Sequence, residues 1–281
     1  MLRAIAEIRR MRGGAQAQMM RCSDDHYYVV KFPNNPQGSR ILANELLGGR
    51  LASLLGLPVA RGEIIFVDDD MVRLSDDLVI QLKNQSRPCQ GGLCFGSRYP
   101  IDPRGCTIIE FLPDALLPRV LNLNDFCGML VFDSWVCNAD GRQVVFHRKP
   151  GDSHFRVTMI DQGFCFGAEK WSFPDSPLRG IYHRRKVYER VRNISAFEPW
   201  LTRLEQLEPE AFREEARTIP PGWYGYDQVG LERLVGQLNQ RRMRVRAMLN
   251  STLRALPDVF PGVGTDREPV VRDYALPLDF R

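Results

Sequence analysis

Lys31 stands in a stretch of chain where a charged residue is costly. It ends the run HYYVVK within residues 26–32, whose aromatic and β-branched residues are typical of a strand. Burial of an unpaired ammonium costs several kcal/mol, so we expect an anionic partner. The helix-like stretch that follows has one acidic residue, Glu45, fourteen positions further on. With the glycine turn at Gly13 and Gly14 before it, such a pair suits a grip on nucleotide phosphates; the alternative is an edge-strand lysine that reaches water.

Two further carboxylates are predicted at neighbouring loop ends. Asp140 follows the helix-like run FDSWVCNA, and Asp161 follows the second of the two strands that come next. Phosphoryl transfer needs such a pair, because one carboxylate orients the attacking hydroxyl while the other holds the magnesium ion that bridges the phosphates. Asp140 fits the first role and Asp161 the second. The alternative is that both aspartates only cap the turns that follow them, which is a common use of this residue.

The elements that must position Lys31 and Glu45 fill the first seventy residues. Two short strands, residues 3–9 and 16–22, flank a glycine turn, and the strand at residues 26–32 follows. Leucines and isoleucines then recur every three or four positions, which predicts a helix over residues 38–55. A further strand is expected at residues 60–67. The pattern is therefore three strands, one helix and another strand.

The middle of the chain changes character twice. Residues 84–105 are rich in Gly, Pro, Ser and Arg, and we expect an irregular insert with little core of its own. A strand at residues 106–112 runs into Pro113 and Asp114, the expected boundary between two lobes. An apolar helix over residues 124–138 then leads to Asp140.

The second half is predicted to be mainly helical after one hairpin. Strands at residues 144–148 and 155–160 are joined by a Pro-Gly-Asp turn, and residues 182–256 have helical periodicity, broken at 220–222. The last 25 residues hold five prolines and no clear period, so we expect a tail that lies on the surface or is partly disordered.

Composition limits the class of protein. The chain has 281 residues, of which 44% are hydrophobic and 26% charged, enough for one large domain or two packed lobes. No apolar run approaches the roughly 20 residues of a membrane span, and residues 1–12 do not have the pattern of a signal peptide. We therefore expect a cytoplasmic protein. The seven cysteines form no C-x-x-C pair, which favours small buried hydrophobic residues over a zinc site or disulfides.

Basic residues gather in two runs of the second half. HRRKVYERVR (residues 183–192) and RRMRVR (residues 241–246) interleave arginine with apolar residues at roughly helical spacing. The pattern favours amphipathic helices with solvated arginine faces, and anion or nucleic-acid contact is the alternative.

Taken together, the motifs resemble those of HipA-like kinases, a bacterial branch of the protein-kinase-like superfamily. The resemblance covers roughly residues 1–250. It rests on YYVVKF with Lys31, ANEL with Glu45, WVCNAD with Asp140 and MIDQGFCFG with Asp161. It implies an α+β, two-lobed protein-kinase-like fold, with a small antiparallel β lobe that carries one helix and a larger, mainly helical lobe.

The resemblance also implies boundaries and ligands. The small nucleotide-binding lobe would span residues 1–112 and the large lobe residues 113–256, with a tail at residues 257–281. ATP would bind in the cleft between the lobes, with the adenine edge against the linker backbone and the phosphates under the glycine turn. The linker residues implied for that contact are Glu110, Phe111 and Leu112.

The sequence departs from the family pattern in two places. The family usually has an asparagine, a second metal ligand, five residues after the catalytic aspartate, where this chain has Val145. Counting back from the strand puts Gln143 in that position, with a shorter loop; its amide oxygen is a possible magnesium ligand, displaced by one methylene. The turn at Gly13 and Gly14 also lacks the serine that some relatives phosphorylate.

These observations predict an ATP- and Mg²⁺-dependent phosphotransferase that acts on a hydroxyl. Ser or Thr of an unidentified protein is the expected acceptor, and a small-molecule hydroxyl is the alternative acceptor. The alternative is a pseudokinase that binds nucleotide without transferring phosphate. A third possibility, binding of nucleic acid or of a partner through the arginine runs, is less favoured, and steep weakening by salt would reveal phosphate-backbone binding. No membrane partner is expected.

Overall fold

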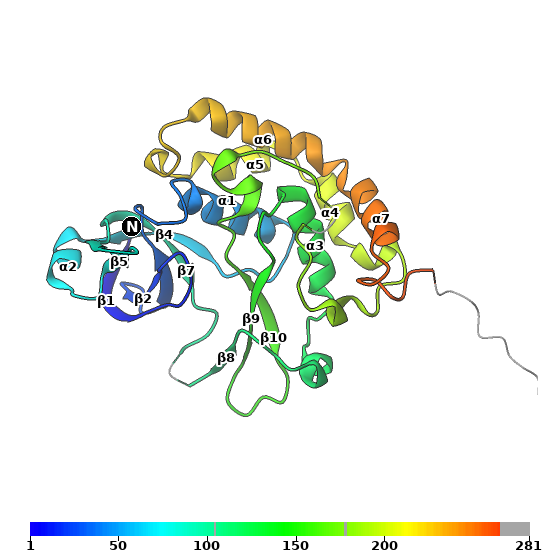
Figure 1. Cartoon of the computed structure of the whole chain (residues 1–281), viewed down its shortest axis with the longest axis horizontal. Coiled ribbons are helices and arrows are strands. Elements are labelled where there is room, and N and C mark those ends of the chain that lie inside the picture. Colours follow the sequence, from blue (N-terminus) through cyan, green and yellow to red (C-terminus); the bar gives the residue numbers. More distant parts are fainter. Residues whose placement is uncertain (104, 177–178, 265–281) are drawn as a thin grey trace, which may run out of the picture.

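The chain forms two lobes joined along one long helix and one linker, as Figure 1 shows. The computed structural model describes residues 1–103, 105–176 and 179–264. The smaller lobe holds a β-barrel, and the larger lobe holds a three-stranded sheet and most of the helices. Helix α1 (Ile41–Leu54) follows the barrel in sequence but packs its leucines into the core of the larger lobe.

The barrel has five strands in the order β1-β2-β3-β7-β4. They are β1 (Leu2–Arg10), β2 (Gln18–Cys22), β3 (Tyr27–Lys31), β7 (Gly92–Arg98) and β4 (Gly62–Val67). All neighbours are antiparallel except β1 and β4, whose parallel pairing closes the barrel. The barrel interior is filled by residues that alternate along these strands, among them Met20, Tyr28, Val30, Ile65, Val67 and Cys94.

A short excursion between β4 and β7 covers one end of the barrel. It consists of α2 (Asp69–Leu74) and the hairpin of β5 (Val79–Gln81) and β6 (Ser86–Pro88). Val72, Leu78 and Ile80 belong to the barrel core, so this excursion adds apolar area to a small lobe.

The prediction that residues 84–105 form an irregular insert was wrong, because β6 and β7 both lie in it. β7 is an internal strand that pairs with β3 on one side and with β4 on the other. Its glycines weaken the strand pattern in the sequence, yet Gly96 has a packing reason: a Cβ there would clash with the side chain of Ile65, which is buried in the barrel. Tertiary contact thus overrides local propensity.

The strand predicted at residues 106–112 is shorter and pairs away from the barrel. β8 (Thr107–Ile109) runs antiparallel to β9 (Gln143–Arg148), which in turn pairs with β10 (Arg156–Ile160). The linker from β7 therefore reaches the sheet of the larger lobe before residue 112, and a division of the lobes at that residue stays a prediction.

The larger lobe packs its helices around α3 (Asp125–Val136), ten of whose twelve residues are buried. The others are α4 (Trp200–Gln206), α5 (Pro209–Arg217), α6 (Gln228–Arg242) and α7 (Val245–Ala255). Short 3-10 turns connect these elements: η1 (Asp114–Arg119), η2 (Cys165–Lys170), η3 (Arg185–Tyr188), η4 (Ile194–Phe197) and η5 (Pro221–Tyr224). No helix within the described residues is both long and apolar enough to cross a membrane.

The arginine runs differ from the predicted helices. Residues 182–199 form η3, η4 and connecting loop, although the buried Val187, Tyr188 and Val191 have helical spacing. The run at residues 241–246 spans the break between α6 and α7. Arg241 is only 6% exposed and donates to the carbonyl oxygens of Ser134 and Trp135 at the end of α3, so it is a buried cap and not part of a solvated face.

The tail is partly built into the core. Val259 and Phe260 are buried there, which the absence of periodicity did not predict. The rest of the predicted tail, residues 265–281, lies outside the described residues.

The internal position of β7 predicts a specific cost at Gly96. Gly96→Ala forces a methyl group against Ile65 and is expected to lower the free energy of unfolding by about 1–3 kcal/mol. In Gly236→Ala, within α6, the added methyl group meets nothing within 4 Å, and alanine favours the helix, so stability should rise by up to about 1 kcal/mol. Urea denaturation measures both. Equal stability of Gly96→Ala and wild type would contradict the close contact between β7 and β4.

Candidate active site

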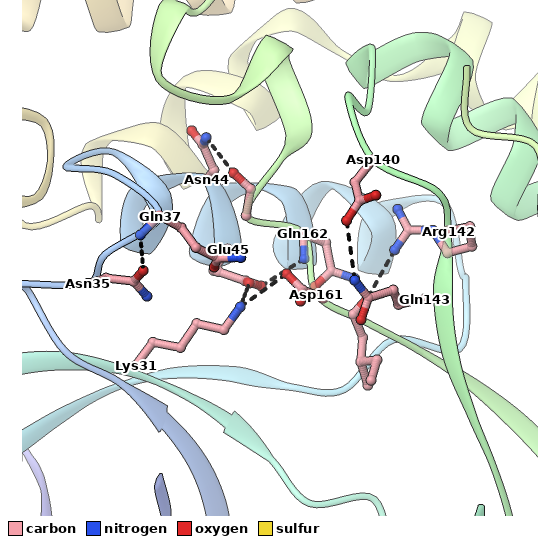
Figure 2. A network of polar contacts seen from close by, with 12 residues as sticks. Lys31, Asn35, Gln37, Asn44, Glu45, Asp140, Arg142, Gln143, Asp161 and Gln162 are labelled. Carbon is pink, nitrogen blue, oxygen red and sulfur yellow. Dashed lines mark hydrogen bonds and ion pairs between the residues drawn. The ribbon is translucent and has the colours of Figure 1, made fainter. Parts of the chain in front are cut away.

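Three buried charges meet where the two lobes join. The ammonium Nζ of Lys31, at the end of β3, forms an ion pair with Glu45 of α1 and lies 3.0 Å from Oδ1 of Asp161. Lys31 is 6% exposed and Glu45 is 1% exposed. Glu45 also accepts a hydrogen bond of 2.8 Å from the backbone N–H of Gln162, which fixes the loop after β10 (Figure 2). The edge-strand alternative for Lys31 is therefore excluded.

The electrostatics of this cluster follow from burial and from its charge count. Burial raises the pKa of the Glu45 carboxyl to about 7, although Lys31 acts to lower it. For Asp161 burial acts in the same direction, but the Lys31 ammonium and the hydrogen bonds to Glu45 and Lys31 outweigh it, so the pKa of Asp161 is lowered. One ammonium thus faces two carboxyl groups. Once Glu45 is ionised, above a pH of about 7, the cluster carries an excess negative charge that a cation would neutralise.

A second buried ion pair shapes the loop that carries Asp140. Arg142 and Asp133 are both buried, and Nε of Arg142 donates to Oδ2 of Asp133 at 2.8 Å. Asn138 donates to the other oxygen of Asp133 at 3.0 Å, and Arg142 also donates to the carbonyl oxygen of Ile160 at 3.1 Å. The pair therefore ties α3, the Asp140 loop and β10 together, and breaking a buried pair by removing one partner is costly.

Asp140 itself is exposed, in contrast to the Lys31 cluster. Its backbone N–H donates to Oδ1 of Asn138 at 3.1 Å, and Nε2 of Gln143 donates to its Oδ2 at 3.3 Å. The N–H of Ala139 donates to the carbonyl oxygen of Phe164 at 2.8 Å, which joins this loop to the one that carries Asp161. Asp140 and Gln143 are thus exposed next to each other and joined by a hydrogen bond.

The cleft between the lobes extends away from these charges. On β3, Tyr28 and Val30 fill the barrel, so Tyr27 and Lys31 lie on the opposite face. On the hairpin of the larger lobe, Phe146 and Val157 belong to the core and the paired residues Val145 and Thr158 lie on the other side.

A cavity of about 530 Å³ lies between these faces. Its lining includes Tyr27 from β3, Arg98 and Tyr99 at the end of β7, and His147 and Thr158 from the hairpin. This volume is in the range of sites for small molecules and cofactors. Tyr27 of this lining and Lys31 of the ion cluster lie at opposite ends of β3, on the same face of the strand.

The other residues predicted to bind nucleotide lie outside the buried cluster of Lys31, Glu45 and Asp161. Gly13 and Gly14 form the turn between β1 and β2, and a Cβ on Gly14 would lie 3.2 Å from Nε2 of Gln37, so the turn sits beside the loop that follows Lys31. Glu110 and Phe111 are exposed, with the guanidinium of Arg184 stacked 4.5 Å from the Phe111 ring centroid.

Leu112 is buried, and its carbonyl oxygen accepts from Arg184. The cavity is lined by residues 98–102 instead of 110–112. The adenine contact at residues 110–112 therefore stays a prediction.

Several functional residues were missed in the sequence. Asp133 and Arg142 were not singled out, because nothing local shows that the two side chains would meet inside the lobe. Asn44, fully buried next to Glu45, was quoted only as part of a motif. Helical periodicity did not mark it, because residue 44 lies on the face opposite the core positions 42 and 46, whereas α1 is buried on all sides.

The residues present suit a magnesium ion. The cluster offers carboxylate oxygens with excess negative charge, and the amide of Gln143 lies exposed beside Asp140, where its oxygen is able to turn toward a metal. No group of three or more His, Cys, Asp or Glu side chains within the described residues forms a complete metal site by itself. The ion would therefore be shared with the phosphates, as is usual for magnesium.

Comparison with solved structures defines the class of fold. The chain is similar to the Helicobacter pylori proinflammatory kinase CtkA, with a TM-score of 0.56 and 12% identity over 90% of this chain and 96% of that one. It is also similar to hydra Fam20 with sugar, with a TM-score of 0.53 and 11% identity over 90% and 85%. The Golgi casein kinase gives a TM-score of 0.51 and 11% identity over 94% and 74%. The fold is that of a protein-kinase-like protein.

The sequence itself identifies the family. The model of the HipA-like kinase family matches residues 5–251, and the chain belongs to this family. A search of curated proteins finds no match. The predicted resemblance and the predicted two-lobed α+β fold are thus confirmed.

The raised pKa of Glu45 predicts a pH-dependent stability. Between its ordinary value of 4.5 and about 7, the folded protein holds a proton on Glu45 that the unfolded chain has released. The free energy of unfolding should therefore fall as pH rises through this window, by about 3 kcal/mol in total. Glu45→Gln has no such proton. Urea denaturation at pH 5, 6, 7 and 8 should show this slope in wild type only, whereas parallel curves would contradict the raised pKa.

Proposed function

We propose that this chain is an ATP- and Mg²⁺-dependent kinase that transfers the γ-phosphoryl group to a serine or threonine hydroxyl of another protein. The observation that carries the proposal is the buried cluster of Lys31, Glu45 and Asp161 at the mouth of the cleft, with exposed Asp140 beside it. Membership of the HipA-like kinase family supports the reaction class.

Each residue has a role that its surroundings support. Lys31, held by Glu45, is positioned to bind phosphate oxygens, and Asp161 is positioned to hold magnesium. The metal, when bound, neutralises charge that develops on the phosphates. The glycine turn at Gly13 and Gly14 covers the phosphates.

Asp140 orients the acceptor hydroxyl and accepts its proton. Because the carboxylate is exposed and hydrogen-bonded to Gln143, a side chain on the surface of a macromolecule is able to reach it. This exposure supports a protein acceptor, in the cytoplasm as the sequence suggests.

One experiment tests the function directly. Purified protein is incubated with γ-labelled ATP and Mg²⁺ in a lysate of the host cells, and labelled species are identified by mass spectrometry. We expect label on serine or threonine of a discrete protein, and none when Mg²⁺ is chelated. Nucleotide binding without any transfer would favour the pseudokinase alternative, which the contact between Gln143 and Asp140 keeps open.

Asp140 and Asp161 should fail in different ways when mutated. Asp140→Asn keeps the shape of the loop and removes no phosphate or metal contact, so Mg-ATP affinity should stay near that of wild type. Transfer should fall by about 10²- to 10⁴-fold, the usual contribution of a positioned proton acceptor. Asp161→Asn removes charge beside the metal and should weaken binding of Mg-ATP itself. Isothermal titration and single-turnover transfer separate the two, and full transfer by Asp140→Asn would refute its role.

A role of Gln143 as a magnesium ligand should show in the concentration of Mg²⁺ that transfer requires. If its amide oxygen binds the metal, Gln143→Ala should raise the free Mg²⁺ needed for half-maximal transfer several-fold, while Gln143→Asn should be tolerated. Titration of activity against free Mg²⁺ measures this. Superimposable curves for wild type and Gln143→Ala would show that the shortened loop provides no second metal ligand.

A further inference from the structure

The segment that carries Asp161 has an unusual backbone. Asp161, Phe166, Ala168 and Trp171 all have positive φ, at 59°, 61°, 62° and 46°. Residues other than glycine seldom adopt this region, and such conformations persist only where surrounding contacts hold them. The contacts that hold this segment therefore decide where the Asp161 carboxylate lies.

Asn44 provides three of these contacts from inside α1. Its Nδ2 donates to the carbonyl oxygen of Gly163 at 2.8 Å and to that of Ala168 at 3.1 Å. Its Oδ1 accepts from Nε1 of Trp171 at 2.8 Å. Asn44 is fully buried, and Figure 2 shows its side chain turned toward the loop after β10. One amide thus uses both of its ends to span residues 163 to 171.

Two more contacts join the same segment to the start of α1. Within the described residues, no side chain of α1 or of Arg40 caps this helix, and its first turn has no acidic residue. Glu169 of η2 provides a carboxylate at the start of α1 instead. Its Oε1 accepts a hydrogen bond from the backbone N–H of Ser39 at 2.6 Å. Arg40 stacks 4.2 Å from the ring centroid of Trp171 and forms an ion pair of 2.7 Å with Asp227.

The segment and α1 therefore form one unit. Glu45 holds Lys31 and the N–H of Gln162, while Asn44, one residue earlier, holds the rest of the loop. Asn44 and Glu45 contact different parts of the loop, because side chains at neighbouring helix positions point in different directions.

We propose that Asn44 is a positioning residue, which fixes the metal-binding carboxylate of Asp161 by clamping residues 163–171 onto α1. The proposal rests on the proposed kinase function for its effect on activity and on the contacts above for the clamp itself. Asn44 touches neither nucleotide nor metal. Its loss acts through the loop, so the requirement for Mg²⁺ should change more than the affinity for nucleotide without metal.

Three variants separate the parts of the clamp. Asn44→Asp keeps an acceptor for Trp171 but replaces the donor to the two loop carbonyls by an oxygen. Trp171→Phe keeps a ring beneath Arg40 and removes only the N–H that donates to Asn44. Asn122→Ala is the matched control, since Asn122 also bridges backbone, to both the N–H and the carbonyl of Val157 at 2.9 and 3.0 Å, but does not touch the Asp161 loop.

Hydrogen exchange followed by mass spectrometry tests the clamp without reference to activity. Asn44→Asp should speed exchange of amides in residues 161–171 at least tenfold, and Trp171→Phe less. Asn122→Ala should leave these amides protected. Equal protection of residues 161–171 in Asn44→Asp and wild type would overturn the proposal, even where all variants transfer phosphate normally.

Magnesium titration then tests the consequence for the active site. The free Mg²⁺ for half-maximal transfer should rise about tenfold in Asn44→Asp, which corresponds to about 1.4 kcal/mol, and should stay unchanged in Asn122→Ala. An equal rise in both variants would reduce Asn44 to a general stabilising role and overturn the proposal. Absence of Mg-ATP binding and transfer in wild type would refute the proposed function instead, and the exchange experiment would still decide the clamp.

Discussion

The arrangement of the two lobes depends on one buried ammonium group, that of Lys31. Lys31 has lost nearly all contact with water, and its charge is tolerable only because two carboxylates meet it. Those carboxylates come from α1 and from the loop after β10, so the barrel, the long helix and the larger lobe must all converge on one point. The cleft exists where they converge.

A second buried ion pair orients the loop that carries Asp140. Asp133 and Arg142 lie wholly inside the larger lobe and orient a loop whose outermost residue, Asp140, is exposed. The first pair therefore holds the groups proposed to bind phosphate and metal, and the second holds the carboxylate proposed to meet the acceptor. The backbone contact between Ala139 and Phe164 links the two, so the relative position of Asp140 and Asp161 depends on both.

The sequence was most informative where chemistry and local pattern agree. Lys31 and Glu45 could be paired in advance, because a lysine in an apolar strand needs a partner and only one acidic residue was available in the next helix. β7 could not be found, since Gly92 and Gly96 lower its strand propensity and the reason for Gly96 is a side chain thirty-one residues away, Ile65.

Sequence patterns also failed to predict which polar residues are buried. Arg241 has the pattern of a solvated helix face, yet its guanidinium caps the end of α3. Asn44 and Arg142 bind groups that are far away in sequence, and local periodicity carries no information about such partners. Sequence pattern thus found the charged residues that meet in the cluster better than the polar groups that hold the surrounding loops.

The shortened loop after Asp140 has a structural cause that the motif comparison alone does not show. Arg142 must lie two residues after Asp140 to reach Asp133 inside the lobe, and β9 begins at the next residue, Gln143. Additional residues before Gln143 would have to form a bulge between a buried side chain and a paired strand. In this chain Gln143 follows the buried Arg142 directly, starts β9 and donates a hydrogen bond to Asp140.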